Sequence, residues 1–109
     1  TFGGNPVCCA GALSVINRMD DDLLKEVREK SSYIIEELNN AKGIKSISGL
    51  GLMLGIETVS DASDVIKKCI DKGVLVIKAK NKVRLLPALN IPWEDLKTAI
   101  DIIKSVCAE

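Results

Sequence analysis

The chain begins with Thr-Phe-Gly-Gly-Asn-Pro at residues 1–6 and continues with Val-Cys-Cys-Ala-Gly-Ala-Leu-Ser-Val-Ile at residues 7–16. The two glycines leave the main chain bare, so another backbone or an anion can approach it closely. Asn5 is a good N-cap and Pro6 suits the first helical position, so these residues predict a helix start. Almost no residue of 7–16 is strongly polar, so we expect most sides of this helix to be covered. We therefore interpret the chain as a piece of a longer one.

The composition is that of an ordinary folded domain. Its 109 residues are 47% apolar and 28% charged, which fits one globular domain with a modest core. Fifteen basic and fifteen acidic residues cancel along the chain. This balance indicates neither a nucleic-acid partner nor a membrane partner. No apolar run reaches membrane-spanning length, and no basic-then-apolar leader opens the sequence.

The cysteines and the absence of histidine narrow the chemistry. Four cysteines occur, at Cys8, Cys9, Cys69 and Cys107, and there is no histidine. No C-x-x-C pair occurs, which argues against a zinc site. We interpret the cysteines as reduced core thiols of a cytoplasmic protein. Without histidine, the chain cannot contain a Cys-His or Ser-His nucleophile of its own.

A long second helix is predicted after the three aspartates at 20–22, whose charge suits a helix start. It runs to Asn39-Asn40, with Gly43 as the stop. The residues expected to face inward recur at helical spacing: Leu23, Leu24, Val27, Ile34, Ile35 and Leu38. The opposite face, which we expect to be solvated, carries Lys25, Glu26, Arg28, Glu29, Lys30 and Glu37.

Two strands are predicted next, at 44–48 and 50–57. In the second strand, residues 50, 52, 54 and 56 are apolar, whereas 51 and 55 are glycines on the other face. Glycines on one face of a strand indicate either close approach by a helix or another chain, or a local bend or bulge.

The remaining sequence predicts one more helix, a pair of strands and a last helix. The helix starts at Ser60 or Asp61, has Ala62, Val65, Ile66, Cys69 and Ile70 inward, and ends at Gly73. Strands at 74–77 and 82–86 are joined by a turn around residues 80–81. The last helix starts at Pro92, with inward residues Leu96, Ala99, Ile100, Ile103, Val106 and Cys107.

The fold class expected from this order is α+β. Residues 20–109 form a compact unit, with helices packed on one face of a mostly antiparallel, three- to four-stranded sheet. Residues 1–19 contain the apolar first helix, which such a unit cannot cover. We expect that helix to pack against a part of the protein that is absent here.

Arg84 and Thr1 are the candidate binding residues. Val83 and Leu85 face one side of their strand, so Arg84 faces the other, near Pro87, in a setting that suits paired hydrogen bonds to a carboxylate. An ordinary surface or salt-bridged arginine is the alternative. The hydroxyl of Thr1 lies beside a Gly-Gly turn and a helix N-terminus, a combination that suits a phosphate. A mobile terminal residue is the alternative there.

Three stretches together resemble one enzyme family. They are residues 1–6, Gly-Leu-Gly-Leu-Met-Leu-Gly-Ile-Glu at 49–57 and Val-Arg-Leu-Leu-Pro at 83–87. In this order they resemble the C-terminal part of the class III pyridoxal-phosphate aminotransferases, and most closely their acetylornithine branch. The chain departs from the family pattern at Ala88, where a second proline is usual, and at Pro92, where Ser or Thr is common.

The resemblance implies a fold, a reaction and roles for residues. The chain would be the small C-terminal domain of a fold-type I transferase, docked on a large pyridoxal-phosphate-binding domain in a homodimer. The parent would transfer the δ-amino group of N-acetylornithine to 2-oxoglutarate in arginine biosynthesis. Arg84 would meet the carboxylate of glutamate or 2-oxoglutarate, and Thr1 would bind the cofactor phosphate across the dimer.

The same resemblance places the cofactor-binding lysine upstream of residue 1. Lys67, Lys68 and Lys104 are predicted on polar helix faces, with no burial to make them reactive, so no residue of this chain is assigned as catalytic. We therefore expect the isolated chain to be inactive. Two alternatives remain: an aminotransferase for ornithine or another ω-amino acid, and a stand-alone regulatory α+β module that binds a small molecule.

Overall fold

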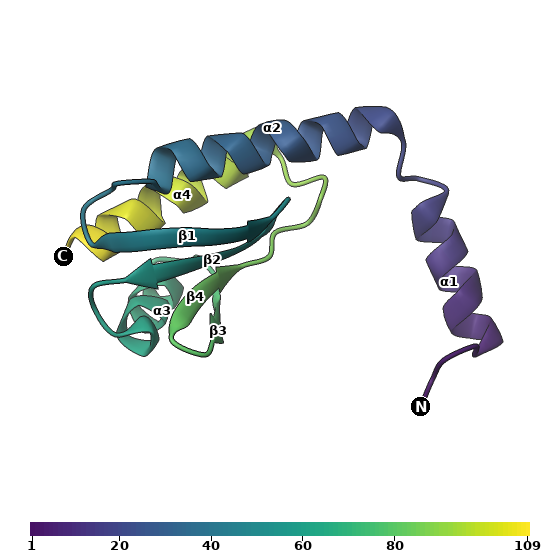
Figure 1. Cartoon of the computed structure of the whole chain (residues 1–109), viewed down its shortest axis with the longest axis horizontal. Coiled ribbons are helices and arrows are strands. Elements are labelled where there is room, and N and C mark those ends of the chain that lie inside the picture. The colour runs from purple at the N-terminus through teal and green to yellow at the C-terminus, as the bar shows by residue number, and fades with distance from the viewer.

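The computed structural model describes all 109 residues and contains four helices and one four-stranded sheet (Figure 1). The elements are α1 (Pro6–Ile16), α2 (Asp21–Leu38), β1 (Ile44–Leu50), β2 (Met53–Thr58), α3 (Ala62–Asp71), β3 (Ile77–Ala79), β4 (Lys82–Leu85) and α4 (Trp93–Ala108). The strand order is β1-β2-β4-β3, and every neighbouring pair is antiparallel. The predicted α+β class and element order are confirmed.

One face of the sheet carries the core. Along β2 and β4, Leu54, Ile56, Val83 and Leu85 are buried, whereas Gly55 and Arg84 between them are only half-buried. The other core residues come from α2, α3, α4 and the adjoining loops: Val27, Ile34, Leu38, Leu52, Ala62, Val65, Cys69, Val76, Leu96, Ile100, Ile103, Val106 and Cys107. The three helices therefore cover one face, and the opposite face stays open.

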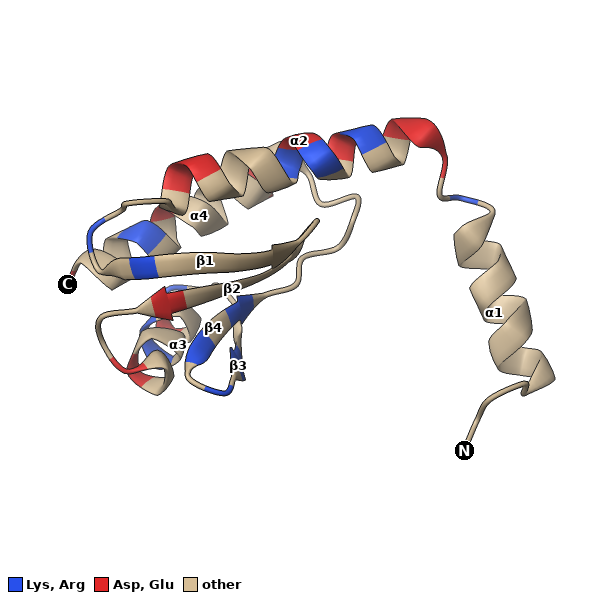
Figure 2. Cartoon of the chain, viewed as in Figure 1, with Lys and Arg blue, Asp and Glu red and all other residues tan.

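Helix α1 stands apart from this core. Its start matches the prediction, because the Asn5 side chain accepts hydrogen bonds from the N–H groups of Val7 and Cys8 at 3.0 and 3.3 Å, with Pro6 first in the helix. No residue of α1 is buried. The helix projects away from the rest of the chain (Figure 1) and carries no charged side chain (Figure 2). The expectation that another part of the protein covers it remains a prediction.

In helix α2, some apolar residues predicted to be buried are exposed, and one lysine predicted to be exposed is buried. Asp20 caps the helix by accepting a hydrogen bond from the N–H of Leu23 at 2.8 Å. Leu24 and Ile35, predicted inward, are 40% and 39% exposed. Lys30, predicted on the solvated face, is fully buried. The buried residues of α2 are Val27, Lys30, Ile34 and Leu38, a narrower stripe than the apolar pattern suggested, on a helix that contacts α4 and β1.

The Lys30 ammonium lies between an acid and an aromatic ring. It forms an ion pair with Glu26, one turn earlier, at 3.1 Å, although it makes no hydrogen bond. It also lies 5.8 Å from the centre of the Trp93 ring, a cation–π distance. Trp93 in turn packs edge-on against Tyr33 at 5.7 Å. Lys30 is buried because its long apolar stem lies under the start of α4.

The end of α2 differs from the prediction. The residue in the left-handed conformation after the helix is Asn40, with φ 63°, and the helix ends at Leu38. Gly43, predicted as the stop, instead precedes β1 with φ 83°. A Cβ atom added at Gly43 would lie 1.7 Å from the carbonyl oxygen of Cys107. A glycine is therefore required at position 43, where the chain passes the end of α4 just before β1 begins.

The β1–β2 boundary was also predicted wrongly. Strand β1 continues to Leu50, which is 89% exposed rather than inward. Gly49 and Gly51 have φ values of 142° and 57°, so the chain reverses there and the second strand begins only at Met53. The alternation that we read as one strand through residues 50–57 crosses this turn.

The last part of the chain has the predicted order of elements, but the strand predicted at 74–77 is wrong, because only its last residue, Ile77, belongs to a strand. Strand β3 contains only Ile77–Ala79, and residues 74–76 precede it outside the sheet. The predicted turn is present, with Lys80 left-handed at φ 57°. Helix α3 is capped by Asp61, which accepts a hydrogen bond from the N–H of Ser63. Helix α4 starts after Pro92 and buries five of its six predicted residues, whereas Ala99 is half-buried.

Candidate functional site

Arg84 lines a hollow of about 350 Å³ on the open face of the sheet. Arg84 pairs across the strands with Gly55, so β2 presents no side chain directly opposite the arginine. Nine residues from the four strands and their turns line the hollow: Ser48, Gly49, Met53, Leu54, Gly55, Ala79, Lys80, Lys82 and Arg84. Three of these residues are cations and none is acidic.

The guanidinium of Arg84 has no partner within the chain. It forms no ion pair and no side-chain hydrogen bond, although it is half-buried. Arg84 is therefore not salt-bridged within this chain, and the ordinary surface arginine stays the alternative to a binding residue. An arginine held on a strand with its donors free can bind a carboxylate through two parallel hydrogen bonds. The arrangement supports anion binding, and the role of Arg84 with a substrate remains a proposal.

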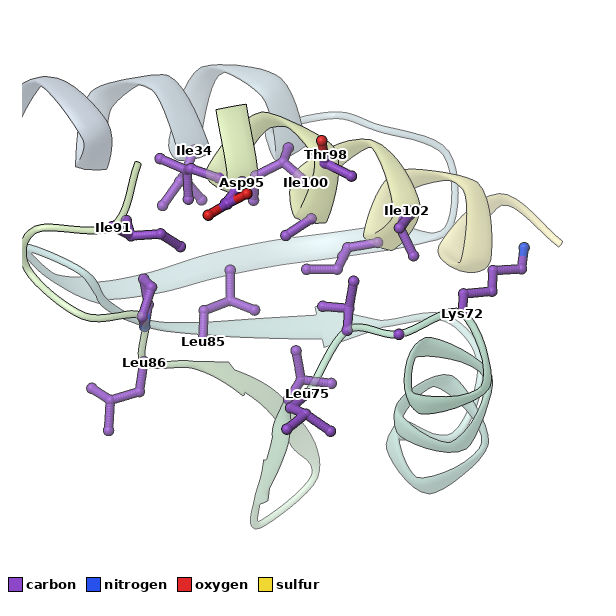
Figure 3. Close-up of a pocket in the computed structure, with 17 residues that line it drawn as sticks. Ile34, Lys72, Leu75, Leu85, Leu86, Ile91, Asp95, Thr98, Ile100 and Ile102 are labelled. Carbon is purple, nitrogen blue, oxygen red and sulfur yellow. The ribbon is translucent and has the colours of Figure 1, made fainter. Parts of the chain in front are cut away.

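A larger hollow, of about 490 Å³, lies on the other side of the sheet (Figure 3). It opens between α4, the segment at residues 72–76 and the end of β4, and most of its lining is aliphatic, including Leu75, Leu85 and Ile91. Its polar lining side chains are Lys72, Asp95 and Thr98. Sequence reasoning missed this hollow. The available signal was the apolar segment 74–77, which we read as a strand although most of it pairs with nothing.

Thr1 lies at the exposed end of the chain, beyond α1 and away from the sheet that carries Arg84 (Figure 1). A single copy of the chain therefore does not bring the two predicted residues together. The N–H groups of Val7 and Cys8 are bound to Asn5. Gly3 and Gly4 have open space around them, so their backbone can be approached by an anion.

The chain offers only part of a pyridoxal phosphate site. The residues at 1–4 fit a phosphate contact, since a hydroxyl and bare backbone lie together there. A covalent site also needs an amine beside a cavity. Lys30 is buried but lines neither hollow, and the hydrogen bond to Glu37 raises the pKa of Lys104. Of the lysines that line the hollows, Lys82 and Lys72 are held by hydrogen bonds, and Lys80 is exposed.

Several shifted pKa values lie at helix ends and between helices. The backbone N–H of Ser63 lowers the pKa of Asp61 at the start of α3. Hydrogen bonds from Lys72 and Lys68 lower the pKa of Glu109 to about 2. Burial raises the pKa of the Cys107 thiol to about 11 and raises that of Cys69. These two cysteines are core thiols as predicted, whereas Cys8 and Cys9 are exposed on α1.

The structure contains neither a metal-binding cluster nor a helix of membrane-spanning character. No group of three or more His, Cys, Asp or Glu side chains is placed to hold a metal ion. None of the helices combines the length and the apolar character that a membrane crossing requires.

Comparison with known sequences identifies one family. A sequence model described as "Aminotransferase class-III" matches residues 1–107. The acetylornithine aminotransferase of Haemophilus ducreyi is 40% identical over 111 residues, an alignment that covers 100% of this chain and 28% of that protein. The corresponding enzyme of Bacillus anthracis is 41% identical over 114 residues, covering 97% of this chain and 29% of that protein. The chain thus spans less than a third of these relatives.

Comparison with solved structures also finds aminotransferases. The ornithine aminotransferase of Toxoplasma gondii superposes with a TM-score of 0.81 at 28% identity, over 99% of this chain and 28% of that one. That structure has partial occupancy of pyridoxal phosphate at its active site.

Proposed function

The chain belongs to the class-III aminotransferase family, and we propose that it is the C-terminal part of an enzyme that transfers the δ-amino group of N-acetylornithine to 2-oxoglutarate. The acetylornithine aminotransferases among its relatives support this donor, and their greater length supports a parent with a further, larger domain. The parent would serve arginine biosynthesis as a cytoplasmic homodimer. The family match favours this reading over the stand-alone regulatory module.

The role proposed for this chain is to bind the carboxylate of the substrate through Arg84. The single observation that carries it is a half-buried guanidinium without any partner, at a hollow where three cations meet no acid. No acceptor of this chain occupies the donors of Arg84, so they are available to an anion. A substrate carboxylate supplies the missing partner, and the rigid strand fixes its orientation for the reaction.

The phosphate contact proposed for Thr1 completes the contribution of this chain. Pyridoxal phosphate, when bound, supplies the electron sink for amino transfer. Thr1 would hold its phosphate in the site of the neighbouring subunit, which fits the separation of Thr1 from Arg84. The lysine that holds the cofactor would lie in the larger domain.

We propose that residues 1–19 dock on that larger domain and that residues 20–109 form the small domain. The support is the contrast between the two parts: α1 has no buried residue, whereas α2, α3 and α4 share one core with the sheet. Covering α1 with another domain would remove its apolar surface from water.

The test is steady-state kinetics of the full-length protein with N-acetylornithine and 2-oxoglutarate. Changing Arg84→Gln should raise the KM for 2-oxoglutarate at least about tenfold, since hydrogen bonds to charged groups contribute about 1.5–3 kcal/mol. Arg84→Lys should recover only part of this loss, because lysine keeps the charge but loses the paired geometry.

The matched control is Lys67→Gln, which removes an exposed positive charge from α3 on the covered side of the sheet. It should leave the KM unchanged. An unchanged KM in Arg84→Gln would refute the role of Arg84. Substitution of ornithine for N-acetylornithine in the same assay decides the amino donor, because an ornithine aminotransferase is among the structural neighbours.

A further inference from the structure

The segment at residues 74–76 has backbone groups without partners. It precedes β3 but does not belong to the sheet. The N–H of Val74 donates to the carbonyl oxygen of Cys69 at 2.8 Å, whereas Leu75 and Val76 make no backbone hydrogen bond. Val76 is nevertheless only 8% exposed. Buried backbone N–H and C=O groups in proteins are nearly always hydrogen-bonded, so we expect this backbone to have a partner.

The apolar hollow beside α4 lies along the same segment. Hydrophobic residues make up 12 of the 17 residues that line it. Leu75 lies on one side of this hollow, and Ile91 and Ile100 lie on the other (Figure 3). The side chain of Leu75 is 84% exposed and that of Ile77 is 50% exposed. An exposed aliphatic stretch beside an aliphatic hollow fits an apolar partner.

The sheet ends at this segment. Strand β3 is an edge strand that pairs only with β4. Strand β4 stops at Leu85, and Pro87 has no N–H to donate, so β4 does not continue along residues 74–76. Free main-chain groups at a sheet edge can instead pair with an extended segment from elsewhere.

A second copy of this chain fits that edge poorly. Lys78 and Lys80 are exposed there, and pairing two copies along β3 would bring these cations close to the same cations of the other copy. The rest of the proposed parent is the better source. This chain covers only 28% of its Haemophilus ducreyi relative, so a parent of similar length has further chain that can supply an extended segment.

We propose that an extended, mainly aliphatic segment from the rest of the parent protein lies along residues 74–76 and places its side chains in the apolar hollow. This inference rests on the proposed function, because it takes the chain as part of a longer protein. Successive residues of an extended chain present their N–H and C=O groups to opposite edges. The added segment therefore exchanges hydrogen bonds with Leu75 or with Val76.

The first test is hydrogen exchange of the unaltered full-length protein, followed by mass spectrometry of overlapping peptides that contain residues 74–80. The amide of Leu75 or of Val76 should exchange at least about a hundredfold more slowly than the amide of Lys80, after correction for intrinsic rates. A hydrogen-bonded amide exchanges only when its surroundings open. Lys80, in the exposed turn before β4, is the internal control.

The second test identifies the segment. Leu75 is replaced by the photo-crosslinker p-benzoylphenylalanine in the full-length protein, and the purified protein is irradiated. The cross-linked peptide should come from the same polypeptide and from outside the 109 residues described here. The same crosslinker in place of Lys67, which is exposed on α3, is the matched control and should give no such product. Thermal unfolding checks that both variants keep their fold.

Exchange of both amides at the rate of the Lys80 amide would overturn the inference. A cross-link to a second copy, a cross-link confined to these 109 residues, or no cross-link from position 75 would overturn it as well. Neither test measures the reaction, and the kinetic test of Arg84 does not depend on the apolar hollow, so this inference and the proposed function can fail separately.

Discussion

At the residue scale, Gly43 shows how one position joins two distant parts of the chain. It lies before β1 with φ 83°, and the carbonyl oxygen of Cys107 occupies the space where a side chain would be. Two separate costs therefore oppose any other residue there. The left-handed backbone disfavours a Cβ atom, and the close carbonyl excludes it.

Gly43→Ala should lower the free energy of unfolding by about 2–5 kcal/mol, the sum of a left-handed backbone cost and a steric cost. Gly73→Ala is the matched control, because Gly73 has φ 88° but nothing within 4 Å of its added Cβ atom. It should cost only about 1–2 kcal/mol. Chemical denaturation of both variants measures the two costs. Equal losses would contradict the contact with α4.

Residue identity alone did not reveal which charged side chains are buried. Lys30 belongs to a run of charged residues, and nothing in its neighbours along the chain distinguishes it from Lys25. Its burial depends on Trp93, which lies more than sixty positions away in the sequence and contacts the Lys30 ammonium only in the folded chain. Such contacts between distant parts of the chain lie outside any local pattern. By contrast, the strand alternation placed Arg84 on the correct face.

At the element scale, ion pairs tie the end of α4 to α3. Glu109 follows α4 and accepts contacts from Lys68 and Lys72, each at 2.9 Å. These contacts lower the pKa of Glu109 from its ordinary 4.5 to about 2. Because the folded pKa lies below the unfolded one, the stabilisation is complete above about pH 4.5 and disappears as the pH falls to about 2.

Glu109→Gln should therefore lower the melting temperature at pH 7 by a small amount, since the pair is exposed to solvent and screened by salt. The difference from the unaltered chain should shrink below pH 4.5 and vanish near pH 2, the range set by the two pKa values. Glu36→Gln, on an exposed position of α2, is the control and should show no such trend. A difference that persists at pH 2 would contradict the ion-pair explanation.

The number and order of elements could be predicted, but their ends could not. The starts of three helices could be predicted because Asn5, Asp20 and Asp61 are side-chain N-caps, which are recognised from the local sequence. The ends of the strands could not be predicted from the sequence, because the apolar alternation continues through the turn at Gly49 and Gly51. Either glycine could have been a strand residue or a turn residue, and only pairing with the partner strand decides between these.

At the scale of the whole molecule, the chain has two parts with different surroundings. Helices α2 to α4 and the sheet share one core, whereas α1 lies outside it with its apolar residues exposed (Figure 1). The apolar first helix, which has no polar face, is the reason for proposing that residues 1–19 dock on another domain, and that division stays a prediction. The partner of α1 could not be predicted from periodicity, since an all-round apolar helix does not identify what covers it.

The candidate site also could be predicted only in part from the sequence. The sequence proposed Arg84 and Thr1, and the structure places them in separate parts of the chain. The hollow around Arg84 needed residues from all four strands, so it became visible only with the sheet assembled. The large apolar hollow beside α4 remained unpredicted for the same reason.

The central claim is that this chain is one part of a class-III aminotransferase whose cofactor-binding lysine lies elsewhere in the protein. The most direct test measures glutamate formed from N-acetylornithine and 2-oxoglutarate, with pyridoxal phosphate added, by the full-length protein and by the 109-residue chain at equal concentrations. We predict cofactor-dependent glutamate formation by the full-length protein and none by the chain alone. Glutamate formation by the chain alone would contradict the claim.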